Sequence, residues 1–204
     1  LSAAAELAHI LGKREQSARF SAAAKDIQSG IIEYLWDEAE GFFIKLCNRS
    51  GNSIDVDRTL DLSSVYGVFS FGVLPPDDVK VVRAFEQSVR RLSYGIEAGG
   101  LARYEGDYYY HSKLKSAGNP WFVTTLWYAE YVIAMAKKDK DLDHVRDIFT
   151  WVTKHAQQSG VLSEQLDPET GAQLSATPLT WSHAAYVAAV LKYLDKVNEL
   201  KQKK

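Results

Sequence analysis

Apolar residues recur at helical spacing along most of the chain. An Ala-rich segment from Leu1 to Leu11 stops at Gly12, and a second apolar stripe runs from about Glu15 to Trp36. Positions three and four apart share one face of an α-helix, so both segments are predicted to be helices. The inward side of the second helix is expected to comprise Phe20, Ala23, Ile27, Ile31 and Leu35.

The next segments alternate turns with buried helices. Residues 41–44 are a short β-like run, and the Ser-Gly-Asn sequence at 50–52 predicts a turn. Residues 60–73 are apolar nearly all round, which predicts a well-buried helix. Two prolines and two aspartates at 75–78 indicate the start of another helix. Its expected stripe is Val79, Val82, Phe85, Val89 and Leu92.

Two long connections, 95–118 and 157–176, each end at a residue pair that predicts a helix start. Asn119 and Thr177 are capping residues, and each is followed by a proline that would occupy the first helical position. Long loops in compact domains are usually functional or disordered, and the tyrosines of the first loop argue against disorder.

Three further helices are expected after residue 118. The first carries Phe122, Leu126, Ala129, Val132 and Ile133 inward. The second begins at Asp141 or Asp143, and its stripe is Val145, Ile148, Phe149 and Val152. The last carries Trp181, Ala184, Ala188, Leu191 and Leu194. No repeat of 34 residues is present, so the alternation predicts helical hairpins in a ring or stack, with the long loops gathered on one side.

Composition narrows the functional classes. The chain has 204 residues, of which 46% are hydrophobic and 25% charged, and its net charge is −2, so no nucleic-acid partner is indicated. No apolar run is long enough to span a membrane. Cys47 is the single cysteine, which excludes an internal disulfide and fits a cytoplasmic protein. The chain starts at Leu1 within a helical pattern, and we expect it to be a piece of a longer protein.

Candidate chemistry is concentrated in the two long loops. Glu164 lies in the second loop, just before a predicted helix that opens with Trp181. A carboxylate beside an aromatic ring suits hydrolysis of a sugar acetal. The loop from Arg103 to Tyr110 combines a cation, two acids and four phenols, as sugar sites do. The alternatives are a solvated surface glutamate and a loop packed by its own tyrosines.

Trp121 and Trp127 lie six positions apart on one predicted helix and are not expected to share a face. We expect Trp127 to be core and Trp121, in the first turn, to reach a site. The five histidines show no metal-ligand spacing, and the one near the candidate site, His183, is expected to be structural. No nucleophile-elbow motif and no glycine-rich phosphate loop occur.

Three ordered blocks resemble the glucoamylase family (glycoside hydrolase family fifteen). They are Gly100-x-x-Arg103-Tyr104 with Asp107-x-Tyr109-Tyr110, then Gly118-Asn119-Pro120-Trp121-Phe122, and Ser163-Glu164-Gln165 with Leu174-Ser175-Ala176 and Leu179-Thr180-Trp181-Ser182. The match covers the last half of the chain by motif and is closer to prokaryotic glucoamylase-like proteins than to fungal ones.

The resemblance implies an all-α (α/α)6 toroid, of which residues 1–204 would form roughly the C-terminal half as one partial catalytic domain. It implies an inverting hydrolase that releases glucose from non-reducing ends of α-linked glucans or oligosaccharides. Glu164 would be the general base, and Arg103 would bind sugar hydroxyls with support from Asp107 and Tyr109. The remaining substrate-binding positions would be Trp121, Ser175 and Trp181. No cofactor and no metal are implied.

Two departures from the family pattern affect the function. The general-acid glutamate of the family lies in a Leu-Trp-Glu motif that we expect upstream of Leu1. The segment Leu35-Trp36-Asp37-Glu38 is similar but is interpreted as a decoy, because it closes a helix before residues 41–43. Residues 111–117 look like an insertion near the leaving-group side.

Other functions stay open at this point. Trehalase and glucodextranase activities occur within the same family, and a panel of trehalose, maltose and isomaltose would distinguish them. A catalytically inactive carbohydrate-binding or structural helical fragment would fit the missing acid. Half a toroid would also expose apolar surface, which the other half of the same protein or self-association would cover.

Overall fold

The computed structural model describes residues 1–111 and 115–202. Its helices are α1 (Ser2–Ile10), α2 (Arg14–Gly30), α3 (Leu62–Ser70), α4 (Val79–Leu92), α5 (Phe122–Met135), α6 (Asp143–His155) and α7 (Thr180–Gln202). Three strands form one sheet: β1 (Trp36–Asp37), β2 (Phe42–Ser50) and β3 (Ser53–Leu60). Four short strands form another: β4 (Leu101–Ala102), β5 (Pro120–Trp121), β6 (Gln165–Leu166) and β7 (Gln173–Leu174).

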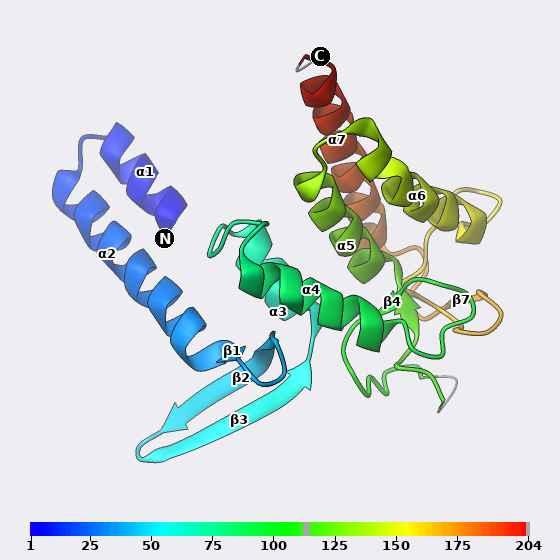
Figure 1. The fold of residues 1–204 in the computed structure, drawn as a ribbon, viewed down its shortest axis with the longest axis horizontal. Helices are drawn as coiled ribbons and strands as arrows, with labels where there is room; N and C mark the ends of the chain where they lie inside the picture. The colour runs from blue at the N-terminus through cyan, green and yellow to red at the C-terminus, as the bar shows by residue number, and fades with distance from the viewer. Residues whose placement is uncertain (112–114, 203–204) are drawn as a thin grey trace.

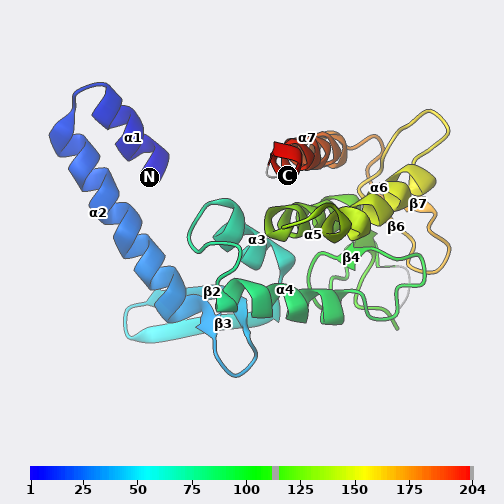
Figure 2. The same cartoon turned by 45° about the horizontal axis from the view of Figure 1, so that its top comes forward.

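The N-terminal helical hairpin stands apart from the other helices (Figures 1 and 2). The hydroxyl of Ser17 joins its two helices by donating to the carbonyl of Ala5 at 2.8 Å. The second helix is shorter than predicted: α2 ends at Gly30, a π-helical turn covers Ile31–Leu35, and the chain then enters β1. No residue of α2 is fully buried. Of the expected apolar stripe, Phe20, Ala23, Ile31 and Leu35 are half-buried and Ile27 is exposed.

A long β-hairpin is the main addition to the all-helical prediction (Figure 1). The β-like run at 41–44 was expected to be short, but β2 continues to Ser50 and pairs with β3. The predicted turn at 50–52 is confirmed, because Ser50 pairs with Ser53 across it. At the base of the hairpin, Phe42, Phe43 and Ile44 are buried, which anchors the hairpin to the body of the molecule.

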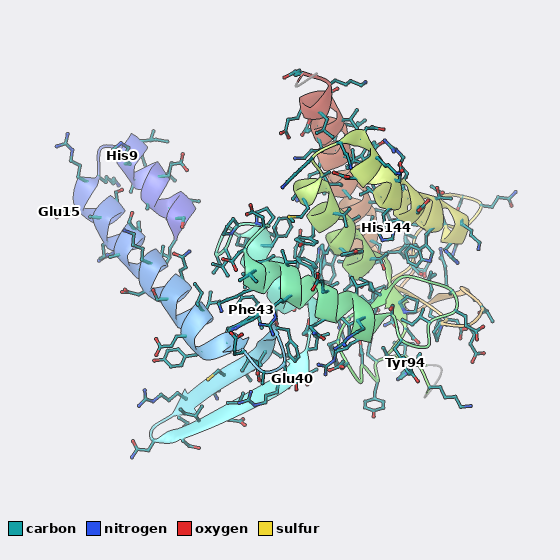
Figure 3. The ribbon with its side chains drawn as sticks, viewed as in Figure 1. His9, Glu15, Glu40, Phe43, Tyr94 and His144 are labelled. Carbon is teal, nitrogen blue, oxygen red and sulfur yellow. The ribbon has the colours of Figure 1, made fainter. Side chains whose placement is uncertain are left out.

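Two apolar cores meet at α5. One contains the base of the hairpin, α3 and α4, and the other lies among α5, α6 and α7. Figure 3 shows Phe43 beside α4, in the first core, and His144 where α6 approaches α5. Tyr131 of α5 stacks on Phe85 of α4 at 3.8 Å between ring centroids, and Tyr128 packs against both cores. Within the described residues, no helix is both long and apolar enough to cross a lipid bilayer.

The predicted helix start at Asn119 is wrong. Pro120 and Trp121 pair as a strand with Leu101 and Ala102, and α5 begins at Phe122. The Asn119 side chain instead donates to the carbonyl of Tyr110 at 2.6 Å and to the side-chain oxygen of Gln165 at 2.8 Å. Tertiary pairing therefore outweighs the local capping preference.

The expected inward face of α7 is also wrong. Its buried residues are Ser182, Ala185, Ala189 and Leu200. The first three lie one position after the expected Trp181, Ala184 and Ala188. Trp181, Leu191 and Leu194 are each about half exposed. The helix begins at Thr180, after a cis peptide bond between Thr177 and Pro178. Small residues allow α7 to approach α5 closely, and this contact decides which face is buried.

The two acids at the start of α4 are confirmed as a helix start, because Asp78 caps the helix by accepting from the backbone N–H of Lys80. The stripe of α4 differs at its first position. Val79 is 68% exposed, whereas Val81 and Ala84 are fully buried. The next helix start is confirmed at Asp143, the second of the two expected positions.

We expect Gly100→Ala to lower the free energy of unfolding by about 2–5 kcal/mol. Gly100 has a φ of +85°, and an added Cβ would lie 2.6 Å from the Trp151 ring and 3.0 Å from the hydroxyl of Thr125. Gly12→Ala is the matched control, since Gly12 has a φ of +71° with open space around it. Urea unfolding of both variants gives the two losses in the free energy of unfolding, and their difference is the cost of the steric clash at Gly100. Equal losses in the two variants would contradict such a clash.

Candidate active site

A small antiparallel sheet brings the three motif blocks together. Leu101 pairs with Trp121, Trp121 with Gln165, and Gln165 with Leu174. Arg103 directly follows β4, Glu164 directly precedes β6, and Ser175 directly follows β7. Figure 1 labels two strands of this sheet, β4 and β7; the sheet lies at the N-terminal end of α5, near the start of α7. Segments more than 60 residues apart therefore contribute side chains to one region.

Glu164 is half-buried, and it is held through both its backbone and its side chain. Its backbone N–H donates to the carbonyl of Ala176 at 3.0 Å. The hydroxyl of Ser175 donates to Oε2 of the carboxylate. Ser175 has a φ of +64°, a left-handed conformation that non-glycine residues rarely adopt. Such backbone strain concentrates at functional sites, where the surrounding structure holds it.

The residues beside Glu164 connect it to α7. Ser163 is fully buried, and its hydroxyl donates to the carbonyl of Gln165 at 2.6 Å. The hydroxyl of Ser182 donates to the carbonyl of Ser163 at 2.7 Å. His183 is structural, as expected, because its Nε2 accepts from the backbone N–H of Leu162 at 3.1 Å. These bonds fix the position of the Glu164 backbone relative to the first turn of α7.

Arg103 and Asp107 form a bidentate ion pair. Nε and Nη2 of Arg103 donate to the two oxygens of Asp107 at 3.0 and 3.1 Å. Asp107 is 2% exposed and also accepts from the backbone N–H of Tyr109 at 3.0 Å. Burial acts to lower the pKa of Arg103, but the hydrogen bonds and charge of Asp107 outweigh it and raise that pKa above its ordinary value. The buried carboxylate of Asp107 therefore fixes the orientation of the Arg103 guanidinium.

The guanidinium of Arg103 lies over two rings. It is 4.5 Å from the centroid of Trp121 and 4.7 Å from that of Tyr104. Tyr109 is farther, at 5.9 Å, and its ring is about half exposed. Nη1 of Arg103 makes no hydrogen bond to the described residues, so one end of the guanidinium stays available to a ligand.

A cavity of about 300 Å³ lies beside this arginine. Its lining residues are Lys45, Asp61, Ser63, Arg103, Tyr104, Trp121, Val123, Thr124, Trp127 and Trp181. Trp121 is 2% exposed, and its indole N–H has no hydrogen-bond partner within the described part of the chain. Aromatic walls with a few convergent polar groups are typical of sugar and other small-molecule sites.

Lys45 and Asp61, a cation and an acid that were not among the predicted site residues, also line this cavity. Nζ of Lys45 lies 3.7 Å from the centroid of the Tyr104 ring and 3.7 Å from Oδ2 of Asp61. Asp61 caps α3, because its Oδ1 accepts from the backbone N–H and the hydroxyl of Ser63 at 2.9 and 2.7 Å. The capping sequence Asp-Leu-Ser was a readable signal for the helix start, but nothing local indicated its distance to Arg103.

The expectation for the two tryptophans is corrected in part. Trp121 lines the cavity and Trp127 packs against the core among α5, α6 and α7, as expected. However, Trp121 precedes α5 instead of occupying its first turn, and Trp127 lines the same cavity. Trp127 is only partly buried; its ring stacks on Tyr66 at 4.4 Å and contacts Trp181 at 5.6 Å. Of the expected site residues, the cavity itself contains Arg103, Trp121 and Trp181. The others, Asp107, Tyr109, Glu164 and Ser175, lie outside its lining.

Glu38 is held by nearby side chains on the surface. Its carboxylate accepts from Trp36 at 2.7 Å and from Arg83 at 2.8 Å, and its side chain is 72% exposed. These hydrogen bonds, first from Trp36 and then from Arg83, lower the pKa of Glu38. Across the described ranges, no group of three potential metal-ligating side chains occurs. Of the expected insertion at 111–117, residues 112–114 lie outside the described residues.

Sequence comparison identifies related hydrolases. The family model described as the mannosylglycerate hydrolase MGH1-like glycoside hydrolase domain matches residues 1–182. An uncharacterized glycosyl hydrolase of Methanocaldococcus jannaschii is 32% identical over 177 residues. That match covers 81% of this chain and 27% of the relative, so the chain spans about a quarter of that protein.

Structural comparison identifies the fold. A bacterial glucoamylase complexed with acarbose superposes with a TM-score of 0.76 at 22% identity, over 96% of this chain and 32% of that chain. A family-fifteen glucoamylase from Hypocrea jecorina gives 0.67 at 20% identity, over 96% and 41%. The expected resemblance to glucoamylases is confirmed, and so is the helical (α/α)6 fold, of which this chain is a part.

Proposed function

The chain belongs to the mannosylglycerate hydrolase MGH1-like glycoside hydrolase domain family, and we propose that it supplies the general base and part of the sugar pocket of an inverting enzyme. The proposed substrates are glucans and oligosaccharides with α-linked glucose at the non-reducing end. The observation that supports the proposal is the small sheet. Trp121 of the cavity pairs with Gln165, which follows Glu164, and Gln165 pairs with Leu174, which precedes Ser175.

Glu164 has the contacts of a general base. Ser175 occupies Oε2, and the other oxygen, Oε1, makes no hydrogen bond to the described residues. In the proposed reaction Oε1 takes a proton from water as the water attacks the anomeric carbon on the face opposite the leaving group. Arg103 orients the sugar by donating to its hydroxyls, and the tryptophan rings contact its apolar C–H face. The resulting sugar has the inverted configuration.

The reaction needs a second carboxyl group about 6.5–9.5 Å from the first to protonate the leaving oxygen. Two acids at or beside the cavity already have structural partners: Asp61 caps α3, and Asp107 binds the guanidinium of Arg103. We therefore assign the general acid to another segment of the protein that carries this chain. A silent carbohydrate-binding fragment stays the alternative if no such acid exists.

A small anionic glycoside is a second candidate substrate. Lys45 and Arg103 lie over the same Tyr104 ring and line the same cavity, which places two cations near a bound aglycone. The family model is described as a mannosylglycerate hydrolase, and glycerate carries a carboxylate that such cations would bind. Trehalose and α-1,6-linked glucosides are the further alternatives.

A substrate panel separates these candidates. We expect hydrolysis of maltose, and we expect NMR to detect the β-anomer as the first product. If the anionic glycoside is the substrate, Lys45→Met should lower kcat/KM on mannosylglycerate about tenfold or more, with little change on maltose, since a charge-assisted hydrogen bond is lost. Lys13→Met, on the exposed connection after α1, is the control. Release of the α-anomer would contradict inversion.

A further inference from the structure

A buried carboxylate joins the three helices behind the cavity. Glu130 on α5 is 3% exposed. Its Oε2 accepts from the hydroxyl of Tyr66 on α3 at 2.9 Å and from Nζ of Lys192 on α7 at 2.6 Å. Glu130 is buried, whereas 48% of the Lys192 side chain is exposed. Taking the Glu130 carboxylate out of water costs free energy, which its two hydrogen bonds offset. The cluster therefore ties α3 and α7 to one acceptor on α5.

The cluster lies on the same helix faces as two rings of the cavity wall. Trp127 precedes Glu130 by three positions, so both lie on one face of α5. Trp181 precedes Lys192 by eleven positions, or about three turns, so both lie on one face of α7. The contact between Glu130 and Lys192 therefore lies on the same helix faces that carry both tryptophans.

Tyr66 connects the ion pair with the wall directly. Its ring stacks on Trp127 with an interplanar angle of 9° and a centroid distance of 4.4 Å, while its hydroxyl donates to Glu130. Trp127 in turn contacts Trp181 edge to face at 5.6 Å. Burial raises the pKa of Tyr66 to about 12, and the Glu130 charge adds to this, whereas Ser70 opposes it. The hydroxyl therefore keeps its proton and its donor role at neutral pH.

We propose that Tyr66, Glu130 and Lys192 are positioning residues that orient Trp127 and Trp181 as the aromatic wall of the Arg103 cavity; a role in sugar binding rests on the proposed function. The hydrogen bond fixes the plane of the Tyr66 ring, and the stacked ring fixes Trp127. The ion pair between Glu130 and Lys192 fixes α7 against α5 and so sets Trp181. A sugar face stacks well only on rings held at the correct angle.

The test uses packing-preserving variants made in the protein that carries this chain. Tyr66→Phe keeps the ring and removes the hydroxyl, and Glu130→Gln keeps the shape and removes the charge. The first readout is the circular-dichroism couplet of the adjacent Trp127 and Trp181 indoles, which depends on their mutual angle and needs no ligand. The second is titration with acarbose. Tyr34→Phe and Lys201→Met, at exposed sites away from the cavity, are the matched controls.

We expect Tyr66→Phe and Glu130→Gln to reduce the couplet and to weaken acarbose binding roughly threefold to tenfold, with both controls unchanged. Lys192→Met should reduce the couplet, whereas Lys192→Arg, which keeps the positive charge, should retain it. An unchanged couplet in Tyr66→Phe overturns the proposal, whether or not Glu130→Gln folds. A reduced couplet in a protein that carries this chain but never binds acarbose supports the positioning role and contradicts the proposed function.

Discussion

Replacing Glu164 with Gln is expected to lower the turnover number by about 10²–10⁴-fold while leaving acarbose affinity nearly unchanged. An amide cannot take the proton of the attacking water, but it has the size of the carboxylate. Its oxygen can still accept the hydrogen bond from Ser175, so the loop conformation is preserved. Steady-state kinetics on maltose, in the protein that carries this chain, measure the loss.

Glu169→Gln is the matched control, because Glu169 is exposed in the same loop. It should retain normal turnover. Near-normal turnover of Glu164→Gln would sink the assignment of the general base. Glucose release by purified residues 1–204 alone would instead show that the general acid lies within the chain, and Glu38 would then be the first residue to replace.

Asp107→Ala is expected to have the largest effect on folding among the site variants. It leaves the Arg103 guanidinium without its bidentate partner, and breaking a buried pair in this way costs about 3–5 kcal/mol. Because 31% of the Arg103 side chain is exposed, we expect a smaller loss in the free energy of unfolding, about 2–4 kcal/mol. Arg103 would also lose its orientation, so KM should rise. Urea unfolding and maltose kinetics measure the two effects.

Two controls separate charge from position. Asp107→Asn keeps the shape and the bond to the Tyr109 backbone and should lose less stability than Asp107→Ala. Asp139→Ala removes a partner of Arg146 on the surface, where an ion pair is worth at most about 1 kcal/mol. If Asp107→Ala lost no more stability than Asp139→Ala, the pair would have no structural role.

The helical periodicity predicted the helices well where each segment supplies its own signal. The acids that mark the starts of α4 and α6 lie within about one turn of the apolar stripe that follows them, and the structure confirms both starts. The start of α5 at Phe122 was not predictable in the same way. The strand that displaces it is formed by partners about twenty and forty-five residues away, at Leu101 and Gln165.

The same distinction between local and long-range signals applies to the residues of the candidate site. Glu164, Arg103 and Trp121 were readable because each belongs to a contiguous motif that resembles a known family. Lys45 was not readable, because its place in the cavity depends on the hairpin, whose base packs on α4. Glu130 likewise looked like one polar residue on an apolar helix, and its partners on α3 and α7 give it a role.

The sequence by itself determined the positions of most helices, the resemblance to glucoamylases and the candidate base Glu164. These rest on short-range spacing, which a linear pattern contains. The tertiary structure alone decided which face of α7 is buried, which side chains line the cavity and which acids are already engaged. Those outcomes depend on contacts between distant segments, and the free energy of such contacts is set by packing and pairing that no local pattern encodes.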